Sequence, residues 1–536
     1  MTWKFPGLVA IALAAGASLP ARSQDIATAN HIAWGTCPAN LASMAGPWAR
    51  RLQCGVFLAP RDWRATGSTR DRPVGLLRIT AGSRAKRQGS LFMNFGGPGL
   101  HPATQLVHLG NDWQATNPAD TVIGAKRRLM QQYDLVTVVP RGLNDHDAFT
   151  CALIDPVAPN DYFLGERSDE NWNALVAAAH GNADDCSSLP DARLMDSEQH
   201  VRDMELARSL LGESRFNFYG ASYGGWVGAL YGSLFPEKVG RMVLDSTVDA
   251  SGSMERFHLL RPQWREHDLT RFGTMPAAAQ PAFWGLGSDS KTIRARLQAM
   301  PKLLRALWIG HAIEPHDVVA ALEVADLYAA QPESLRTRSA MKRKIAGHHF
   351  HDRINQTVAA SATRLVDLLP ESAGSRAPYA YGWPGATLAT YCNDGRWRST
   401  PAGVRASLGR NSEFASFDDG DSSLIRLICA RWPNSGAARP SMAALRTAPG
   451  LLMIHSDLDL ITPLKGALTM AAELPTSKLI VVEGLATHGV MTAAPSCAIT
   501  AAGDFLLTGN LPQAAHSTCV SGALVPKRPD PTRDEL

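Results

Sequence analysis

The stretch NFYGASYGGWVG places a single serine, Ser222, between closely spaced glycines. Gly220 and Gly224 lie two residues on either side of it, a spacing that suits a turn too tight for a Cβ atom. The preceding residues, Phe216–Tyr219, have the apolar and aromatic character of a buried strand, and a helical pattern follows. A serine at such a junction exposes its Oγ, and the helix N-terminus can stabilise a developing anion. We therefore interpret Ser222 as a nucleophile rather than as part of a glycine-rich packing turn.

A nucleophilic serine needs a base, and the base needs an acid to orient it. His488 follows the apolar run Leu479–Val482, within EGLATHGV. Asp457 and Asp459 follow the run Leu451–Ile454, within HSDLDLITP. If both runs are parallel strands, their following loops meet at the sheet edge where ligands gather. His488 is thus the candidate base, whereas the local sequence does not choose between the two aspartates.

The oxyanion of an acyl-transfer reaction needs N–H donors. The first candidate is the amide of Tyr223, directly after the nucleophile. The second should come from the turn NFGGPGL, where the backbone N–H groups of Gly96 and Gly97 are unobstructed and Pro98 stiffens the chain. The alternative interpretation of this segment is an ordinary β-turn.

The elements that would position these residues alternate along the chain. Helical patterns such as Val201–Leu211 and Trp226–Phe235 separate several short apolar runs, which predicts βαβ units and a mostly parallel sheet flanked by helices. The segment Arg256–Leu369 is helix-rich instead, with periodic stretches at Val318–Tyr328 and Val358–Leu369. The expected strands are Leu91–Phe95, Leu135–Val139, Phe216–Tyr219, Met242–Leu244, Leu451–Ile454 and Leu479–Val482.

This pattern predicts one α/β core interrupted by a helical insertion. The expected parts are a signal peptide at 1–23, the core at 24–250 and 386–520, a helical cap at 251–385, and a C-terminal tail at 521–536. A chain of 536 residues with 45% hydrophobic and 19% charged residues can bury a large core. The formal net charge of +4 indicates no polyanionic partner, so we interpret the basic run at 336–344 as a solvated helix face and expect no nucleic-acid binding.

The N-terminus has the features of an export signal. Lys4 precedes the apolar run Gly7–Leu19, which is too short to span a bilayer, and small residues favour cleavage before Gln24. No later segment predicts a membrane span in the mature chain. We expect a periplasmic or secreted bacterial protein, and we treat the C-terminal Arg-Asp-Glu-Leu as a coincidental match to a retention tail.

The eight cysteines fit an oxidising compartment, because their number is even and none has the C-x-x-C spacing of a zinc or thioredoxin site. Sequence cannot fix their connectivity, and pairing of sequential neighbours is the simplest hypothesis. The pairs would be Cys37 with Cys54, Cys151 with Cys186, Cys392 with Cys429, and Cys497 with Cys519.

Seven motifs together resemble one known family. NFGGPG, PRG, YGASYGG, VLDSTVD, CARWP, DLITP and THG follow the order seen in the tripeptidyl aminopeptidase and proline iminopeptidase group of α/β-hydrolases, from about Trp34 to Cys519. The resemblance implies an α/β-hydrolase fold with a cap over Ser222. The family pattern D-P-V-T-P selects Asp459 as the acid, and the box H-G-G-P-G points to Gly97 as the second oxyanion donor.

Three positions depart from the family pattern while the triad residues match it. Phe95 replaces the histidine of the box, Val139 replaces an aspartate before PRG, and Leu460 replaces a proline. The resemblance implies an exported serine exopeptidase acting on peptide N-termini, without a metal or organic cofactor. The alternatives are a carboxylesterase that uses the same triad on small esters, and a binding protein on the same fold. The second alternative would be expected to have lost a triad residue. The oligomeric state is left open.

An aminopeptidase must also bind the cationic α-amine of its substrate, and a partly desolvated carboxylate does this best. We expect at least one acid of the insertion to face Ser222, the candidates including Glu255, Glu266, Glu314 and Glu323. A cluster of histidines at 348, 349 and 351 could bind a metal, but a polar surface is the favoured interpretation.

Overall fold

The computed structural model describes residues 31–144, 148–151, 168–308, 313–371, 385–410, 421–459, 461–485, 487–493 and 495–520. The expected signal peptide, the C-terminal tail and Leu460 lie outside the described residues. Within those ranges, every helix is too short or too polar to cross a membrane.

The described strands form one sheet in the order β1-β2-β3-β5-β4-β6-β7-β8-β9-β10. From β5 to β10 all neighbours are parallel, whereas β1, β2 and β3 pair antiparallel. All six predicted strands are confirmed, and four further strands, β1, β2, β3 and β10, were not predicted. The bounds are β1 (Ala33–Gly35), β2 (Leu52–Pro60), β3 (Arg70–Ile79), β4 (Ser90–Asn94), β5 (Asp134–Val138), β6 (Phe216–Ala221), β7 (Val239–Asp245), β8 (Leu452–Ser456), β9 (Lys478–Glu483) and β10 (His516–Val520).

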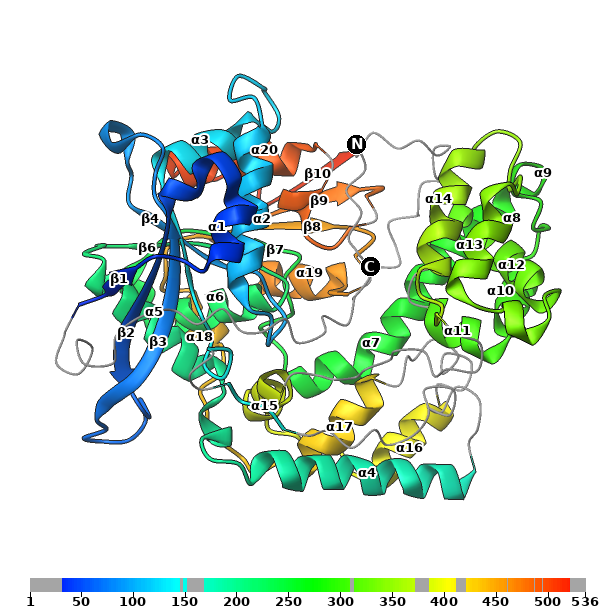
Figure 1. The fold of residues 1–536 in the computed structure, drawn as a ribbon, viewed down its shortest axis with the longest axis horizontal. Helices are drawn as coiled ribbons and strands as arrows, with labels where there is room; N and C mark the ends of the chain where they lie inside the picture. The colour runs from blue at the N-terminus through cyan, green and yellow to red at the C-terminus, as the bar shows by residue number, and fades with distance from the viewer. Residues whose placement is uncertain are drawn as a thin grey trace.

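Helices cover both faces of this sheet (Figure 1). One face packs against α1 (Ala39–Ala45), α2 (Pro102–Ala115), α3 (Gly124–Gln132) and α20 (Cys497–Thr508) around one apolar core. The other face packs against α5 (Ser197–Leu210), α6 (Tyr223–Leu234), α18 (Met442–Leu445) and α19 (Leu464–Glu473) around a second core. The strands between these layers are buried on both sides, so the carboxyl edge of the sheet is where polar side chains can meet substrate.

Every described element between the adjacent strands β7 and β8 is a helix. The lobe on the right of Figure 1 has its own apolar core and joins the sheet through α7. A second group of helices packs with α4 beneath the sheet. The first lobe contains α7 (Met254–Asp268), a π-helical turn (Leu269–Thr274), α8 (Met275–Ala279), α9 (Pro281–Trp284), α10 (Ser290–Gln298), α11 (Lys302–Trp308), α12 (Pro315–Ala329), α13 (Arg338–Ala346) and α14 (Asn355–Val366). The second group contains α4 (Asp169–Ser187), α15 (Gly385–Asn393), α16 (Pro401–Arg410) and α17 (Asp421–Arg431).

Four disulfides join the cysteines in sequential pairs, as the simplest hypothesis proposed. They are Cys37–Cys54, Cys151–Cys186, Cys392–Cys429 and Cys497–Cys519. The third ties α15 to α17, and the fourth ties the start of α20 to β10.

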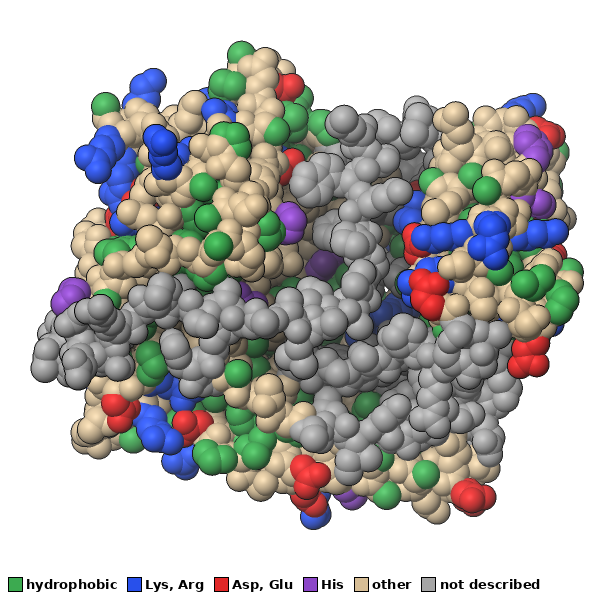
Figure 2. Space-filling view, viewed as in Figure 1, with side chains coloured by type: hydrophobic (Ala, Val, Ile, Leu, Met, Phe, Trp, Pro, Cys, Tyr) green, Lys and Arg blue, Asp and Glu red, His purple; other side chains and the backbone are tan. Residues whose placement is uncertain are grey.

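The basic run on α13 carries acidic partners. Lys342 pairs with Asp367, and Arg338 Nη1 lies 2.8 Å from Glu371 Oε1. Figure 2 shows blue and red side chains side by side on this lobe. Charges of both signs are therefore interspersed there, as expected of a solvated helix face.

Candidate active site

Ser222 occupies the turn between β6 and α6, with φ 59° and ψ −123°. Such a conformation costs a non-glycine residue about 1–3 kcal/mol. The two glycines of the motif are required by close backbone approaches. A Cβ on Gly220 would lie 2.4 Å from Gly224 O, and a Cβ on Gly224 would lie 2.4 Å from Asn94 O. The sharp turn raises Ser222 at the carboxyl edge of the sheet and directs the amino end of α6 toward it.

His488 and Asp459 form a close pair at the same edge of the sheet. His488 Nδ1 lies 2.9 Å from Asp459 Oδ2 and 3.0 Å from Oδ1. Thr462 completes the arrangement, because its N–H donates to Asp459 Oδ1 at 3.0 Å and its Oγ1 lies 3.0 Å from Asp459 Oδ2. Asp457 instead accepts the Gly484 N–H at 2.9 Å, which ties two loops together. The geometry therefore favours Asp459 over Asp457 as the acid.

The charges of this pair shift the pKa of both Asp459 and His488. Burial opposes the charged form of each group, but the attraction between them outweighs it. The result is a pKa of Asp459 below its ordinary value and a pKa of His488 above its ordinary value of 6.5. The imidazole is thus oriented by an ionised carboxylate, as a general base requires.

The turn after β4 packs on the nucleophile. Asn94 Oδ1 accepts the Gly96 N–H at 3.0 Å, so the amide of Gly97 is the next donor of this turn. Helix α15 fixes the same segment, because Tyr391 Oη donates to Gly97 O at 3.2 Å and Thr387 Oγ1 donates to Pro98 O at 2.9 Å. The turn is therefore held by Asn94 and by helix α15, which keeps its backbone N–H groups in place as an oxyanion site needs.

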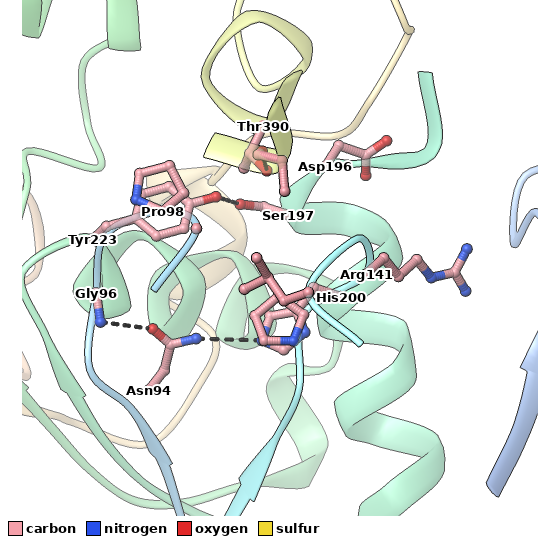
Figure 3. A pocket seen from close by; sticks show the side chains of 13 residues that line it. Asn94, Gly96, Pro98, Arg141, Asp196, Ser197, His200, Tyr223 and Thr390 are labelled. Carbon is pink, nitrogen blue, oxygen red and sulfur yellow. Dashed lines mark hydrogen bonds between the residues drawn. The ribbon is translucent and has the colours of Figure 1, made fainter. Parts of the chain in front are cut away.

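A cavity of about 20 Å³, with room for about one water, lies behind this turn. Figure 3 shows Gly96, Pro98 and Tyr223 on one side of it and Ser197 and His200 on the other. Burial lowers the pKa of His200 to about 4, so this imidazole is neutral near pH 7. Asn94 Nδ2 donates to its Nε2 at 3.3 Å, which orients the Asn94 amide toward Gly96.

Tyr223, the other candidate oxyanion donor, is held by a carboxylate that the sequence did not single out. Asp394 accepts Tyr223 Oη at 2.5 Å, Ser197 Oγ at 2.7 Å and Ser197 N at 2.8 Å, and the two hydroxyls contact each other. Burial raises the pKa of Asp394 to about 7. The group joins residues about 200 positions apart, so no local sequence signal could have revealed it.

The four acids named from the sequence are engaged within the helical segments. Glu255 accepts Arg398 N and Ser399 Oγ, and Glu266 pairs with Arg294 at 2.7 Å. Glu314 caps α12, and Glu323 lies 2.7 Å from His348 Nε2. These contacts have structural roles that explain the acids without a substrate.

Two residues of α7 that were not predicted, Asp268 and Arg261, interact electrostatically with the His488–Asp459 pair. Burial raises the pKa of Asp268, and the charge of Asp459 adds to that rise. The positive charge of Arg261 lowers the pKa of His488. Both charges are close enough to act on the pair, which places α7 in its vicinity. Their spacing along one helix face is the only sequence signal they carry.

Among the described residues, Glu314, His316 and Asp317 form a cluster of metal-ligand type. Asp317 Oδ1 is already taken by Ser361 Oγ at 2.6 Å and by Arg364 Nη2 at 2.9 Å. An arginine bonded to the ligand oxygen disfavours a cation, so the cluster is better explained as the cap of α12.

The three neighbouring histidines at the end of α13 also have separate partners. His348 Nε2 contacts Glu323, His349 Nε2 lies 3.0 Å from Asp352, and His351 Nε2 lies 2.7 Å from Phe283 O. These contacts favour a polar surface over a shared metal.

Three comparisons relate this chain to known proteins. A family model described as TAP-like protein matches residues 417–519. The tripeptidyl aminopeptidase of Streptomyces lividans is 26% identical over 500 residues, covering 88% of this chain and 84% of that protein. The serine protease Hip1 of Mycobacterium tuberculosis is 24% identical over 495 residues, covering 86% of each chain. An acetylester hydrolase structure from Corynebacterium glutamicum has a TM-score of 0.33 at 12% identity, covering 87% of this chain and 94% of that one.

The family match covers the segment that carries Asp459 and His488, and the two relatives extend the similarity over most of the chain. The mostly parallel sheet with helices on both faces is the architecture of the α/β-hydrolase fold. The chain is thus a serine hydrolase of the α/β-hydrolase fold, related to the tripeptidyl aminopeptidases.

Proposed function

We propose that the chain is an exported aminopeptidase that cleaves peptides through an acyl-enzyme formed on Ser222. The observation that carries this proposal is the His488–Asp459 pair beside the Ser222 turn. The Ser222 N–H donates to Asp245 O at 2.9 Å, and the side chain of the same Asp245 accepts the Val490 N–H from the His488 loop at 2.7 Å. One residue therefore holds the nucleophile turn and the base loop.

In the proposed mechanism, His488 Nε2 takes the proton of Ser222 Oγ as the oxygen attacks the scissile carbonyl. The N–H groups of Tyr223 and Gly97 stabilise the oxyanion. His488 then returns the proton to the leaving amine, and the acyl-enzyme forms. Water, deprotonated by the same imidazole, attacks the ester and releases the product with Ser222 restored.

Asp268 is the carboxylate that we propose for the substrate amine. It lies at the end of α7, its side chain is only 13% exposed and lies 3.2 Å from Nδ1 of the exposed His267, and its charge interacts with that of Asp459. An α-ammonium bound there would neutralise a buried charge, and poor screening would strengthen the attraction. Two relatives, a tripeptidyl aminopeptidase and a serine protease, are consistent with a peptide substrate.

Export is proposed from the four disulfides together with the N-terminal sequence, since such bonds persist in oxidising compartments. The second candidate function is a carboxylesterase. The same triad and oxyanion donors would serve small esters, which carry no amine for Asp268 to bind.

The test compares tripeptidyl chromogenic substrates with free and N-acetylated termini, together with a short-chain ester, on the purified mature enzyme. We expect free-amine peptides to be cleaved with the highest kcat/KM. Asp268→Asn should raise KM for these substrates and spare the ester, whereas Asp326→Asn, which changes an exposed acid of α12, should change neither. Equal cleavage of acetylated and free peptides by the wild type would replace the aminopeptidase with the esterase.

A further inference from the structure

The turn that begins at Asp245, the last residue of β7, contacts each loop that carries a triad candidate. Its first two residues, Asp245 and Ser246, are fully buried, and Ser246 has a positive φ of 49°. Such a conformation is costly for serine and persists only where the surroundings enforce it. The same turn accepts the Ser222 N–H through Asp245 O, and Val248 N donates back to Ser222 O at 3.3 Å.

The loop that carries His488 is held by side chains of this turn. The N–H groups of three successive residues, Gly489, Val490 and Met491, donate to it. Ser246 Oγ accepts the first at 2.9 Å, and the two Asp245 carboxylate oxygens accept the second and third at 2.7 and 2.8 Å. The three residues directly after the base are thus fixed by two neighbouring side chains.

The loop that carries Asp459 reaches the same turn through Thr462. Thr462 Oγ1 donates to Ser246 O at 2.7 Å while it contacts Asp459 Oδ2 at 3.0 Å. In addition, Ser246 N donates to Ile454 O in β8 at 2.9 Å. The nucleophile, base and acid loops therefore share one anchoring point, although they come from separate parts of the chain.

We infer that Asp245 and Ser246 are positioning residues that hold the three loops in the geometry needed for acyl transfer, an inference that rests on the proposed Ser222 mechanism. Neither side chain needs to touch substrate. A carboxylate is suited to this place because it can accept both backbone N–H groups, together with Tyr219 Oη at 2.8 Å, without carrying a competing donor.

Besides its hydrogen bonds, the charge of Asp245 affects the pKa of His488. The groups whose charges act on His488 are Asp459 and Asp245, which raise its pKa, and Arg261, which lowers it. Burial raises the pKa of Asp245 itself, and the hydrogen bonds that its oxygens accept from Met491, Val490 and Tyr219 oppose that rise by stabilising the charged form. Removing its charge should therefore lower the pKa of His488 and shift the acid limb of kcat/KM to lower pH.

The experiment measures kcat, KM and the pH profile of Asp245→Asn, Tyr219→Phe, Ser246→Ala and Ser246→Gly in the full-length mature enzyme. For Asp245→Asn we expect kcat to fall by about 10- to 100-fold, because small misplacements at an active site can cost 10²-fold. KM should change little, and the acid limb should move to lower pH. Tyr219→Phe keeps the charge, so its acid limb should stay in place.

The two Ser246 variants separate hydrogen bonding from backbone strain. Alanine keeps the Cβ and therefore the backbone strain that serine already bears at this positive φ, whereas glycine relieves it, and both variants remove the Oγ that accepts Gly489 N–H. Loss of kcat in both variants supports the inference. Wild-type kcat in Ser246→Gly overturns the role of Ser246, and this variant decides the question if Asp245→Asn does not fold.

Two matched controls complete the design. Asp134→Asn changes a buried carboxylate that accepts Ala81 N–H at 2.8 Å, but at the amino end of β5. Ser233→Ala removes a serine oxygen that accepts Ser441 N–H at 2.9 Å, away from the triad loops. Both controls should keep kcat and the pH profile. Wild-type kcat and an unmoved acid limb in Asp245→Asn, with an inactive Ser222→Ala, would overturn this inference alone, whereas an active Ser222→Ala would overturn the mechanism beneath it.

Discussion

Gly96 packs directly against Ser222: a Cβ on Gly96 would lie 2.7 Å from Ser222 Cβ and 3.3 Å from its Oγ. The turn that offers the oxyanion donor and the turn that offers the nucleophile are therefore in van der Waals contact. Their spacing is set by a missing side chain, because nothing larger than hydrogen fits between them.

Gly96→Ala should consequently lower kcat, because the added methyl group displaces either the oxyanion turn or Ser222. We expect a loss of about 10- to 100-fold, by the same sensitivity to misplacement. Gly67→Ala is the matched control, since Gly67 also has a positive φ of 74° but has open space where its Cβ would lie. Comparable kcat in the two variants would show that the close contact at Gly96 is irrelevant to turnover.

The two candidate acids can be separated by amide substitutions. Asp459→Asn should reduce kcat by about 10⁴-fold, because the amide no longer stabilises the required imidazole tautomer. Asp457→Asn weakens the bond to Gly484 N and should leave kcat nearly unchanged. Steady-state kinetics of both variants on one substrate provide the measurement, and the reverse ranking would reassign the acid to Asp457.

The pH dependence follows from the state of His488. The base must be neutral to accept the Ser222 proton, and its pKa lies above the ordinary 6.5 because the nearby carboxylates outweigh burial. The value of kcat/KM should therefore increase as the imidazole loses its proton with rising pH. The midpoint of this acid limb should lie above pH 6.5. In Asp459→Asn the residual activity should show its acid limb at lower pH. An unchanged limb would mean that another group controls it.

The disulfides of the C-terminal half should contribute to stability. Replacing Cys497 and Cys519 by serine releases β10 from α20, and losing a native bridge typically costs about 2–5 kcal/mol. Denaturant unfolding of this variant should show a lower midpoint than the wild type. Mass mapping of the unreduced protein provides the direct check, and free thiols at these two positions would contradict the pairing.

The strands that could be predicted from the sequence are those that are apolar along their whole length because both of their faces are buried. The six central strands are buried on both faces, so they appear as continuous apolar runs. Strand β3 was missed because charged residues interrupt that pattern, and β2 was missed because Gln53, Gly55 and Pro60 interrupt its apolar run. Arg72 and Arg78 in β3 lie 2.9 Å from Asp191 and 3.7 Å from Asp134, partners that are distant in sequence. β10 is short and mostly polar, so it carries no apolar signal.

The residues of the candidate site also fall into two groups, those with a local sequence signal and those without one. Ser222, His488 and the two aspartates could be named because each follows a recognisable strand, and backbone geometry demands glycines beside the nucleophile. Asp245 was named only as part of the motif VLDSTVD, and Asp394 was not predicted to have a functional role. Their roles depend on hydrogen bonds to distant segments, which the order of residues along the chain does not reveal.

The most direct test of the account is to find which side chain becomes acylated. The mature enzyme is treated with a fluorophosphonate, a reagent that phosphonylates activated serines, and the modified peptide is identified by mass spectrometry. The account predicts one stoichiometric adduct on Ser222, complete loss of turnover in step with labelling, and no such adduct in Ser222→Ala, whose activity should be about 10⁶-fold lower. An adduct on another residue, or full turnover in Ser222→Ala, would contradict it.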